Sequence, residues 1–329
     1  MVFPQLAPLA RTTTRLHPRP GSPSVRGSSV GGPLLWPVAE AWPFCDGPHQ
    51  PDGRPATTVQ DVRLLRQLMT AANNRPAGDM LFTPQEQEVV DRIDRGRPWP
   101  DEPVAMLPVA QLYCRDVPHL RVPEQADMLQ VLWCPFDHPE QQIPKTALFW
   151  RSSALLTDVV ASPPQPVAVQ HEGYVPQPCL IHPELVTEYP APLELEQGLR
   201  EQVEQWSARQ KAGAAPGSAY DQAESAFYQY ELSVAPGWKV GGWAPWSFTD
   251  PQPLPCQSCG TPLEPLLTIA SNEWDDSNHS WIPYEDRDDA TRDVYPDPAR
   301  PSLVSVAGFN LQLYVCPVSP EHPHAELLQ

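Results

Sequence analysis

The cysteines and histidines near the end of the chain have types and spacings that suit a metal ion. Cys256 and Cys259 form a Cys-x-x-Cys pair, in which two thiolates on one tight turn can face the same tetrahedral zinc ion. A structural zinc site takes four protein ligands, so two more are needed. Cys316 is the candidate third ligand, and His322 or His324 is the candidate fourth. These four residues are the candidate zinc ligands, with His322 as the assigned fourth ligand, although we expect a protein without a cofactor and keep zinc binding as the alternative.

The preferred interpretation is that these thiols pack as small apolar groups in a turn. No second Cys-x-x-Cys pair is present, although zinc sites commonly combine two such pairs. A redox-active pair would need a strand–helix–strand pattern around it, which is absent. An earlier set has similar residue types, but its first two members fall in a Pro/Gly loop, so it is the weaker candidate: Cys45, His49, Cys134 and His138.

The sequence contains no recognisable catalytic constellation. The Gly-x-Ser-x-Gly elbow and the two common phosphate-binding glycine patterns are absent. The aspartate pairs at 275–276 and 288–289 lack the alternation and the glycine of a calcium-binding loop, so a solvated acidic loop is preferred. We expect a protein that is not an enzyme. The alternative is a metal-dependent enzyme that uses the Cys256/Cys259 cluster.

Charge and composition restrict the kind of partner. The net charge is −18 at pH 7, which argues against binding to nucleic-acid phosphates and suits a basic protein client. The sequence has no apolar run of about 18 residues, so we expect no membrane partner. In the first 30 residues, prolines and arginines interrupt the sequence before the apolar core of a signal peptide can form. The chain has seven cysteines, an odd number that cannot all pair in disulfides. We therefore expect a cytoplasmic protein without a disulfide framework.

The elements that must position these residues follow one pattern that occurs twice. Three landmarks recur in the same order, and chance similarity in a proline-rich chain is the alternative. The landmarks are Val-Gly-Gly (30–32 and 240–242), a strand with an internal proline (106–112 and 263–269), and Leu-Gln-x-x-x-Cys-Pro (129–135 and 311–317). Each copy also has a cysteine after its Gly-Gly pair, and we expect the two copies to share one core.

The second copy resembles the bacterial YwqG-like family, a domain of unknown function that is similar to eukaryotic programmed cell death protein 2. The shared signature is Lys-Val-Gly-Gly, then Cys-x-x-Cys-Gly, then Pro-Leu and a Leu-Leu strand, here 239–242, 256–263 and 266–267. The first copy departs from it, because Cys45 stands without a Cys-x-x-Cys partner. The resemblance implies a duplicated, strand-rich α+β fold. From the eukaryotic members it also implies a chaperone-like role in holding a ribosomal protein.

The pattern predicts an α+β fold of internally duplicated antiparallel sheet units with a helical insertion. The 45 prolines among 329 residues, against an average share of about 5%, favour short strands bounded by turns. Helices are expected within the insertion, over 193–211, and from about 218. The expected boundaries are a flexible arm (1–29), a first unit (30–160) with its insertion (about 50–103), a proline-rich connector with a helix pair (161–234), and a second unit (235–329).

The second Gly-Gly pair and the tryptophans beside it are the candidate client-binding residues. The glycines favour a turn or a close backbone approach over a phosphate cradle. Neighbouring tryptophans serve either as core or as the floor of a peptide groove. We expect a protein or peptide client to contact Gly241, Gly242, Trp243 and Trp246, and an architectural role for the glycines is the alternative.

Overall fold

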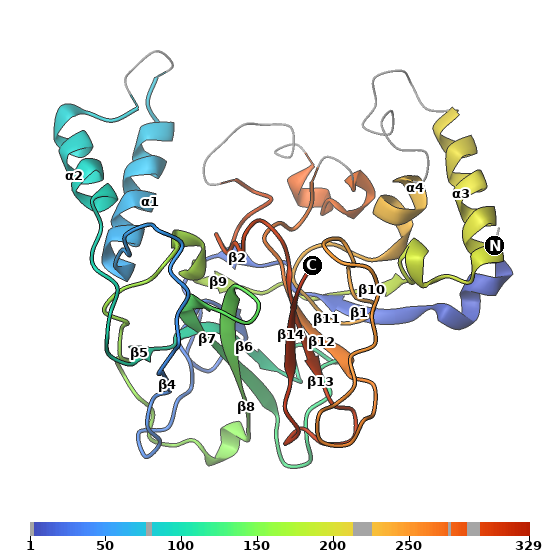
Figure 1. The fold of residues 1–329 in the computed structure, drawn as a ribbon, viewed down its shortest axis with the longest axis horizontal. Helices are drawn as coiled ribbons and strands as arrows, with labels where there is room; N and C mark the ends of the chain where they lie inside the picture. Colours follow the sequence, from blue (N-terminus) through green and yellow to red (C-terminus); the bar gives the residue numbers. More distant parts are fainter. Residues whose placement is uncertain (1–2, 77–80, 213–225, 276–277, 288–296) are drawn as a thin grey trace.

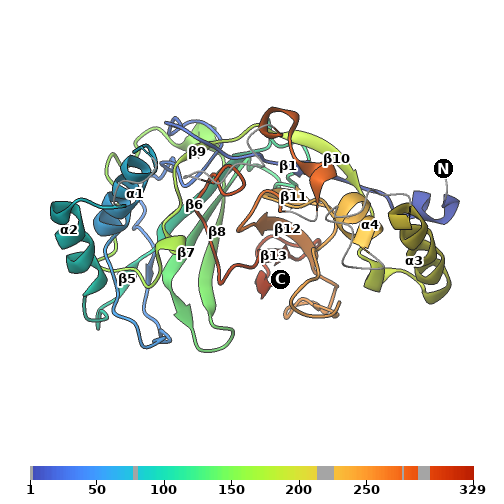
Figure 2. The same ribbon diagram turned by 90° about the horizontal axis from the view of Figure 1, so that it is seen from above.

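Two six-stranded antiparallel sheets lie next to each other, with a helix pair at either end of the molecule (Figures 1 and 2). The computed structural model describes residues 3–329 except 77–80, 213–225, 276–277 and 288–296. The sheets meet at two of their edge strands, where the backbone N–H of Thr146 donates to the Glu326 carboxylate at 2.9 Å. The predicted α+β, strand-rich fold class is confirmed.

The first sheet is built around a meander of four strands. Its order is β2 (Arg19–Pro20), β9 (Cys179–Leu180), β3 (Ser29–Val30), β6 (Leu107–Tyr113), β7 (Met128–His138) and β8 (Ile143–Arg151), and the meander consists of β3, β6, β7 and β8. A separate ladder of β4 (Phe44–Cys45) and β5 (Val104–Ala105) lies beside the sheet. In the chain, this ladder and the two helices of the insertion come between β3 and β6.

The second sheet contains a meander of the same kind. Its order is β10 (Glu184–Glu188), β1 (Arg11–Arg15), β11 (Lys239–Gly241), β12 (Glu264–Ile269), β13 (Leu311–Val315) and β14 (Ala325–Leu328).

The two meanders agree in detail. In both, the pairing register shifts just after the internal proline, at Pro108 in β6 and at Pro265 in β12. In both, the glutamine of the Leu-Gln landmark pairs with the strand before it, Gln130 with Gln111 and Gln312 with Thr268. The duplication stays a prediction, which these parallels support. The expected shared core is present, since one apolar cluster contains buried residues of both sheets.

Two of the expected segments differ from the prediction, and the end of the second unit forms a strand. Residues 1–29 do not form a flexible arm, because β1 lies between β10 and β11 with Thr13 and Thr14 fully buried. The segment 161–234 is more than a connector, since it supplies β9 to the first sheet and β10 to the second. The Pro/His end forms β14. These strands are short or rich in Thr and Glu, so the sequence alone shows little apolar signal for them.

The predicted helical insertion forms two helices. In α1 (Val59–Asn73), the side chain of Thr58 caps the first turn by accepting from the N–H of Asp61. In α2 (Pro84–Asp94), Thr83 and Glu86 form the expected capping box. The later helices are α3 (Gln197–Ala212) and α4 (Ala226–Tyr228), and the helix start expected near 218 lies outside the described residues.

Short helical turns occupy several connections. They are 3-10 turns at Pro4–Leu9, Ser153–Leu155, Glu172–Tyr174, Pro192–Glu194, His279–Trp281 and Tyr284–Asp286, and a π turn at Gln229–Ser233. Within the described ranges, no helix combines the length and apolar character that a membrane crossing requires.

Candidate metal centres and binding groove

The four residues predicted to bind zinc converge in the second unit, and together they form what we name the second cluster: Cys256, Cys259, Cys316 and His322. Their ligand atoms all lie within 4.8 Å of one another. His322 Nδ1 lies 3.4 Å from Cys256 Sγ and 3.2 Å from Cys316 Sγ, and the Sγ atoms of Cys259 and Cys316 are 3.6 Å apart. His324 is not part of the cluster and instead contacts the hydroxyl of Thr146.

A tight turn and the end of a strand position these ligands. The N–H of Gly260 donates to the Cys256 carbonyl, and the N–H of Cys256 donates to the Thr261 carbonyl, both at 2.8 Å. Gly260 has a φ of +72°, which a residue with a side chain adopts at a cost. Cys316 directly follows β13, and His322 lies in the connection to β14.

The set that the sequence ranked lower also converges, and we name it the first cluster: Cys45, His49, Cys134 and His138. Its ligand atoms again lie within 4.8 Å of one another. Cys45 Sγ is 3.4 Å from His138 Nε2, and Cys134 Sγ is 3.3 Å from His49 Nε2. Two of the residues lie in β7 and one in β4, and the loop of His49 is tied to β7 by a backbone hydrogen bond from Gln50.

Both clusters have the dimensions of a tetrahedral zinc site. Zn–S bonds near 2.3 Å and Zn–N bonds near 2.0–2.1 Å place neighbouring ligand atoms roughly 3.3–3.8 Å apart. The separations given above run from 3.2 to 3.6 Å. All seven cysteines are free thiols, so no disulfide competes for these ligands.

Hydrogen bonds favour the thiolate form, which is the form that binds metal, at one cysteine of each cluster. The side chain and backbone N–H of Thr261 lower the pKa of Cys259 to about 6. In the first cluster, a hydrogen bond from Cys134 is the largest effect that lowers the pKa of Cys45. Burial raises the pKa of Cys316.

The two clusters differ in exposure. In the first, both cysteines and His138 are buried, and they adjoin an apolar cluster that includes Trp36, Trp42 and Phe136. In the second, Cys259 is exposed and His322 is half-buried. Each cluster offers four protein ligands, which fills a tetrahedral site and leaves no position for a reacting molecule.

The predicted binding residues divide between two roles. Gly242 has a φ of +77°, and a Cβ there would collide with the carboxylate of Glu188 and with Thr13. That carboxylate forms a fully buried ion pair with Lys239 at 2.5 Å and accepts the N–H of Trp243 at 2.7 Å. Gly242 and Trp243 therefore adjoin a buried ion pair, which matches the architectural alternative, whereas an added Cβ at Gly241 would meet nothing within 4 Å.

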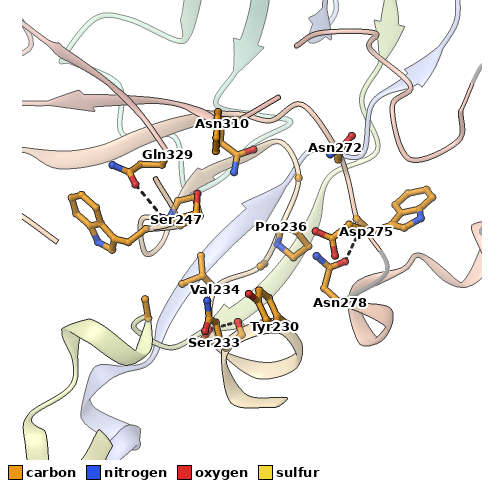
Figure 3. Close-up of a pocket in the computed structure, with 18 of the residues that line it drawn as sticks. Tyr230, Ser233, Val234, Pro236, Ser247, Asn272, Asp275, Asn278, Asn310 and Gln329 are labelled. Atoms are coloured by element: carbon orange, nitrogen blue, oxygen red, sulfur yellow. Dashed lines mark hydrogen bonds between the residues drawn. The ribbon is translucent and has the colours of Figure 1, made fainter. Parts of the chain in front are cut away.

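Trp246 lines a groove of about 250 Å³ between the second unit and the segment before it in the chain. Figure 3 shows side chains from several segments around one space, with Tyr230 and Ser233 on one side and Asn310 and Gln329 on another. Other aromatic walls are Trp274 and Phe309. The sequence did not indicate the groove as a whole, because its residues come from segments spread between 191 and 329.

No model of a known protein family matches this chain, and no curated protein matches it. The geometry of the two clusters and of the groove therefore carries the argument about function.

Proposed function

We propose that this protein is a non-enzymatic module that binds a protein or peptide client and is held together by two structural zinc ions. The observation that carries the proposal is that eight Cys and His side chains form two complete four-ligand sets, one in each unit. Zinc prefers exactly these donors, and four of them make a closed structural site. Reduced thiols are needed, so we also propose a cytoplasmic location.

Each zinc ion would cross-link two parts of its unit. In the first unit it joins β4 and the loop of His49 to β7, just before the β7–β8 hairpin. In the second unit it joins the Cys256–Cys259 turn to the connection between β13 and β14. Structural zinc contributes apparent binding energies of about 10–16 kcal/mol in small domains, because the site forms only in the folded chain.

The groove around Trp246 is the proposed client site. Its aromatic residues offer apolar faces, and its amide side chains can pair with peptide N–H and C=O groups. The amides are Asn272, Asn278, Asn310 and Gln329. Among the described residues of the lining, Asp275 is the charged one, and the chain carries −18 overall, so a basic client fits best. The motif resemblance to the YwqG-like family points in the same direction.

Metal analysis tests the zinc part. Protein purified without a histidine tag should contain two zinc ions per chain, and Cys134→Ser or Cys316→Ser should each remove one. Cys114→Ser is the matched control, since this cysteine lies outside both clusters. Protein that carries no zinc after purification in metal-supplemented buffer would overturn the proposal.

Affinity purification from the native cell tests the client part. A stoichiometric basic partner should be recovered, and Trp246→Ala should lose it without a change in Tm. Tyr284→Ala removes an aromatic residue that is 81% exposed and outside the groove, so it should retain the partner. If both variants retain the partner, the groove is not the client site.

The alternative is a metal-dependent enzyme that uses the second cluster. The exposure of Cys259 favours it, because a displaced Cys259 would open one metal position to a substrate. Zinc that binds a small thiol or hydroxamate inhibitor in the intact protein would support this alternative, and a coordination shell that stays fully protein-derived would exclude it.

A further inference from the structure

A second cavity, of about 460 Å³, lies where the two units meet and has a different chemistry from the groove. The first unit contributes β7 and α1 to its lining, and the segment between the units contributes the turn at Glu172–Tyr174. The second unit contributes the segment 300–308. A cavity of this size falls in the range of small-molecule sites, and neither zinc cluster lines it.

Three arginines line this cavity in a protein whose net charge is −18. The guanidinium of Arg66 is buried and donates to the carbonyl of Glu172 at 2.8 Å, which fixes it in the wall. Arg54 and Arg300 have no hydrogen-bond or ion-pair partner for their side chains among the described residues. The Nε of Arg300 is buried without an acceptor, which costs free energy unless a ligand supplies one.

The acidic groups near these arginines already have partners or face solvent. Both oxygens of Asp137 accept hydrogen bonds, one from the hydroxyl of Tyr174 at 2.6 Å and one from Gln170 at 2.9 Å. His171 contacts Asp52 at 3.3 Å, and the side chain of Glu172 is exposed. In the described part of the chain, no hydrogen bond or ion pair joins the side chain of the exposed Arg54 or of Arg300 to these acidic groups, and the three arginines of the lining outnumber its two acidic residues, Asp137 and Glu172.

The backbone of the segment 300–308 is held in an unusual conformation beside the arginines. Leu303 has a φ of +51° and Ala307 a φ of +52°, values that residues with side chains rarely adopt. The carbonyl of Leu303 accepts from Arg66 at 3.4 Å, and the N–H of Ser305 donates to the carbonyl of Gly173 at 3.1 Å. These contacts fix the wall across the two units before any ligand binds.

We propose that this cavity binds a small ligand with two or more oxyanion groups, and that Arg54 and Arg300 make the direct contacts. A guanidinium presents its N–H groups in a planar fork that matches the two oxygens of a carboxylate or a phosphate. The inference is independent of the zinc ions and of the client groove.

Calorimetric titration of the intact zinc-bound protein tests this proposal, with citrate as the carboxylate probe and pyrophosphate as the phosphate probe. At least one anion should bind with a stoichiometry of one, and sodium chloride of equal ionic strength should not replace it. Arg54→Gln and Arg300→Gln should each weaken binding about tenfold or more. The tighter probe identifies carboxylate or phosphate as the preferred group.

Arg63→Gln is the matched control, because Arg63 lies exposed on α1 outside the cavity. It should bind the probe as the wild type does, and the zinc content of all three variants should stay at the wild-type value. The proposal is overturned if neither anion binds at millimolar concentration, or if Arg63→Gln weakens binding as much as the cavity variants do.

Discussion

The residues around the second Gly-Gly pair show how one buried charge pair constrains a backbone. Lys239 and Glu188 are fully buried, and removal of either partner would leave an uncompensated charge. The Glu188 carboxylate also accepts the N–H groups of Trp243 and Ala235, so its position is fixed. Gly242 packs directly against it, and no side chain fits in that space.

Gly242→Val should destabilise the fold by about 1–3 kcal/mol or more, through strain at a positive φ and collision with Glu188. Chemical denaturation measures this loss. Gly241→Val is the control, since Gly241 has a φ of +73° with nothing within 4 Å of an added Cβ, and it should show the backbone strain alone. Equal losses for the two variants would show that the collision is unimportant.

A second buried carboxylate predicts a pH dependence. Glu273 is almost fully buried, and this burial raises its pKa to about 7, although Trp238 N–H donates to it. At pH values between the ordinary glutamate pKa near 4.5 and about 7, Glu273 keeps its proton in the folded chain but has lost it in the unfolded chain. Glu273 therefore lowers stability progressively as pH rises through this window. His17 Nδ1 lies 3.7 Å from the Glu273 carboxylate, and burial lowers the pKa of His17 to about 4. His17 therefore has the opposite effect: it makes the protein less stable as the pH falls below 6.5.

Glu273→Gln removes the loss of stability with rising pH that Glu273 causes, and it leaves the effect of His17 in place. The stability of the variant relative to the wild type should increase by up to about 3 kcal/mol between pH 4.5 and pH 7. Urea denaturation of both proteins at several pH values measures the difference, and effects of the zinc ligands cancel in it. A difference that stays constant with pH would show that Glu273 is ionised throughout.

At the scale of elements, the sequence predicted what local chemistry determines. The capping box of Thr83 and Glu86 and the strands β6, β7, β12 and β13 were found, because caps and apolar runs are local signals, whereas β14 in the Pro/His end of the chain was not. The strands β1, β9 and β10 were missed, since their pairing partners are distant in the chain. The convergence of the first cluster was difficult to predict for the same reason: Cys45 and Cys134 come together only through the fold, although Cys-x-x-x-His occurs at both.

The exposure of the two clusters predicts that they lose zinc at different rates. A chelating dye should remove zinc from the wild type in two phases, the faster from the second cluster, because Cys259 is exposed while the first cluster lies in an apolar core. Cys316→Ser should abolish the fast phase and keep the slow one. Release in a single phase, or a fast phase that persists in Cys316→Ser, would contradict this order.

At the scale of the whole molecule, neither unit is complete by itself. The second sheet contains β1 from the start of the chain and β10 from the segment between the units. The first sheet is extended by β2 and β9, which flank the first unit in the chain. One apolar cluster runs through both sheets, with Val131 and Leu313 among its fully buried members. Each unit therefore depends on strands from outside its own boundaries.

The residues 30–160 and 235–329, expressed separately or together, should give no cooperatively folded product. They lack β1, β2, β9 and β10, which leaves the edges of β3 and β11 unpaired and apolar core exposed. The matched control is a split between Glu196 and Gln197, which are exposed at the start of α3. This split keeps every strand within one of two pieces, so co-expressed fragments 1–196 and 197–329 should form a stable complex. Thermal unfolding and zinc content measure both cases, and a soluble 30–160 fragment that unfolds cooperatively would show that the first unit is an independent domain.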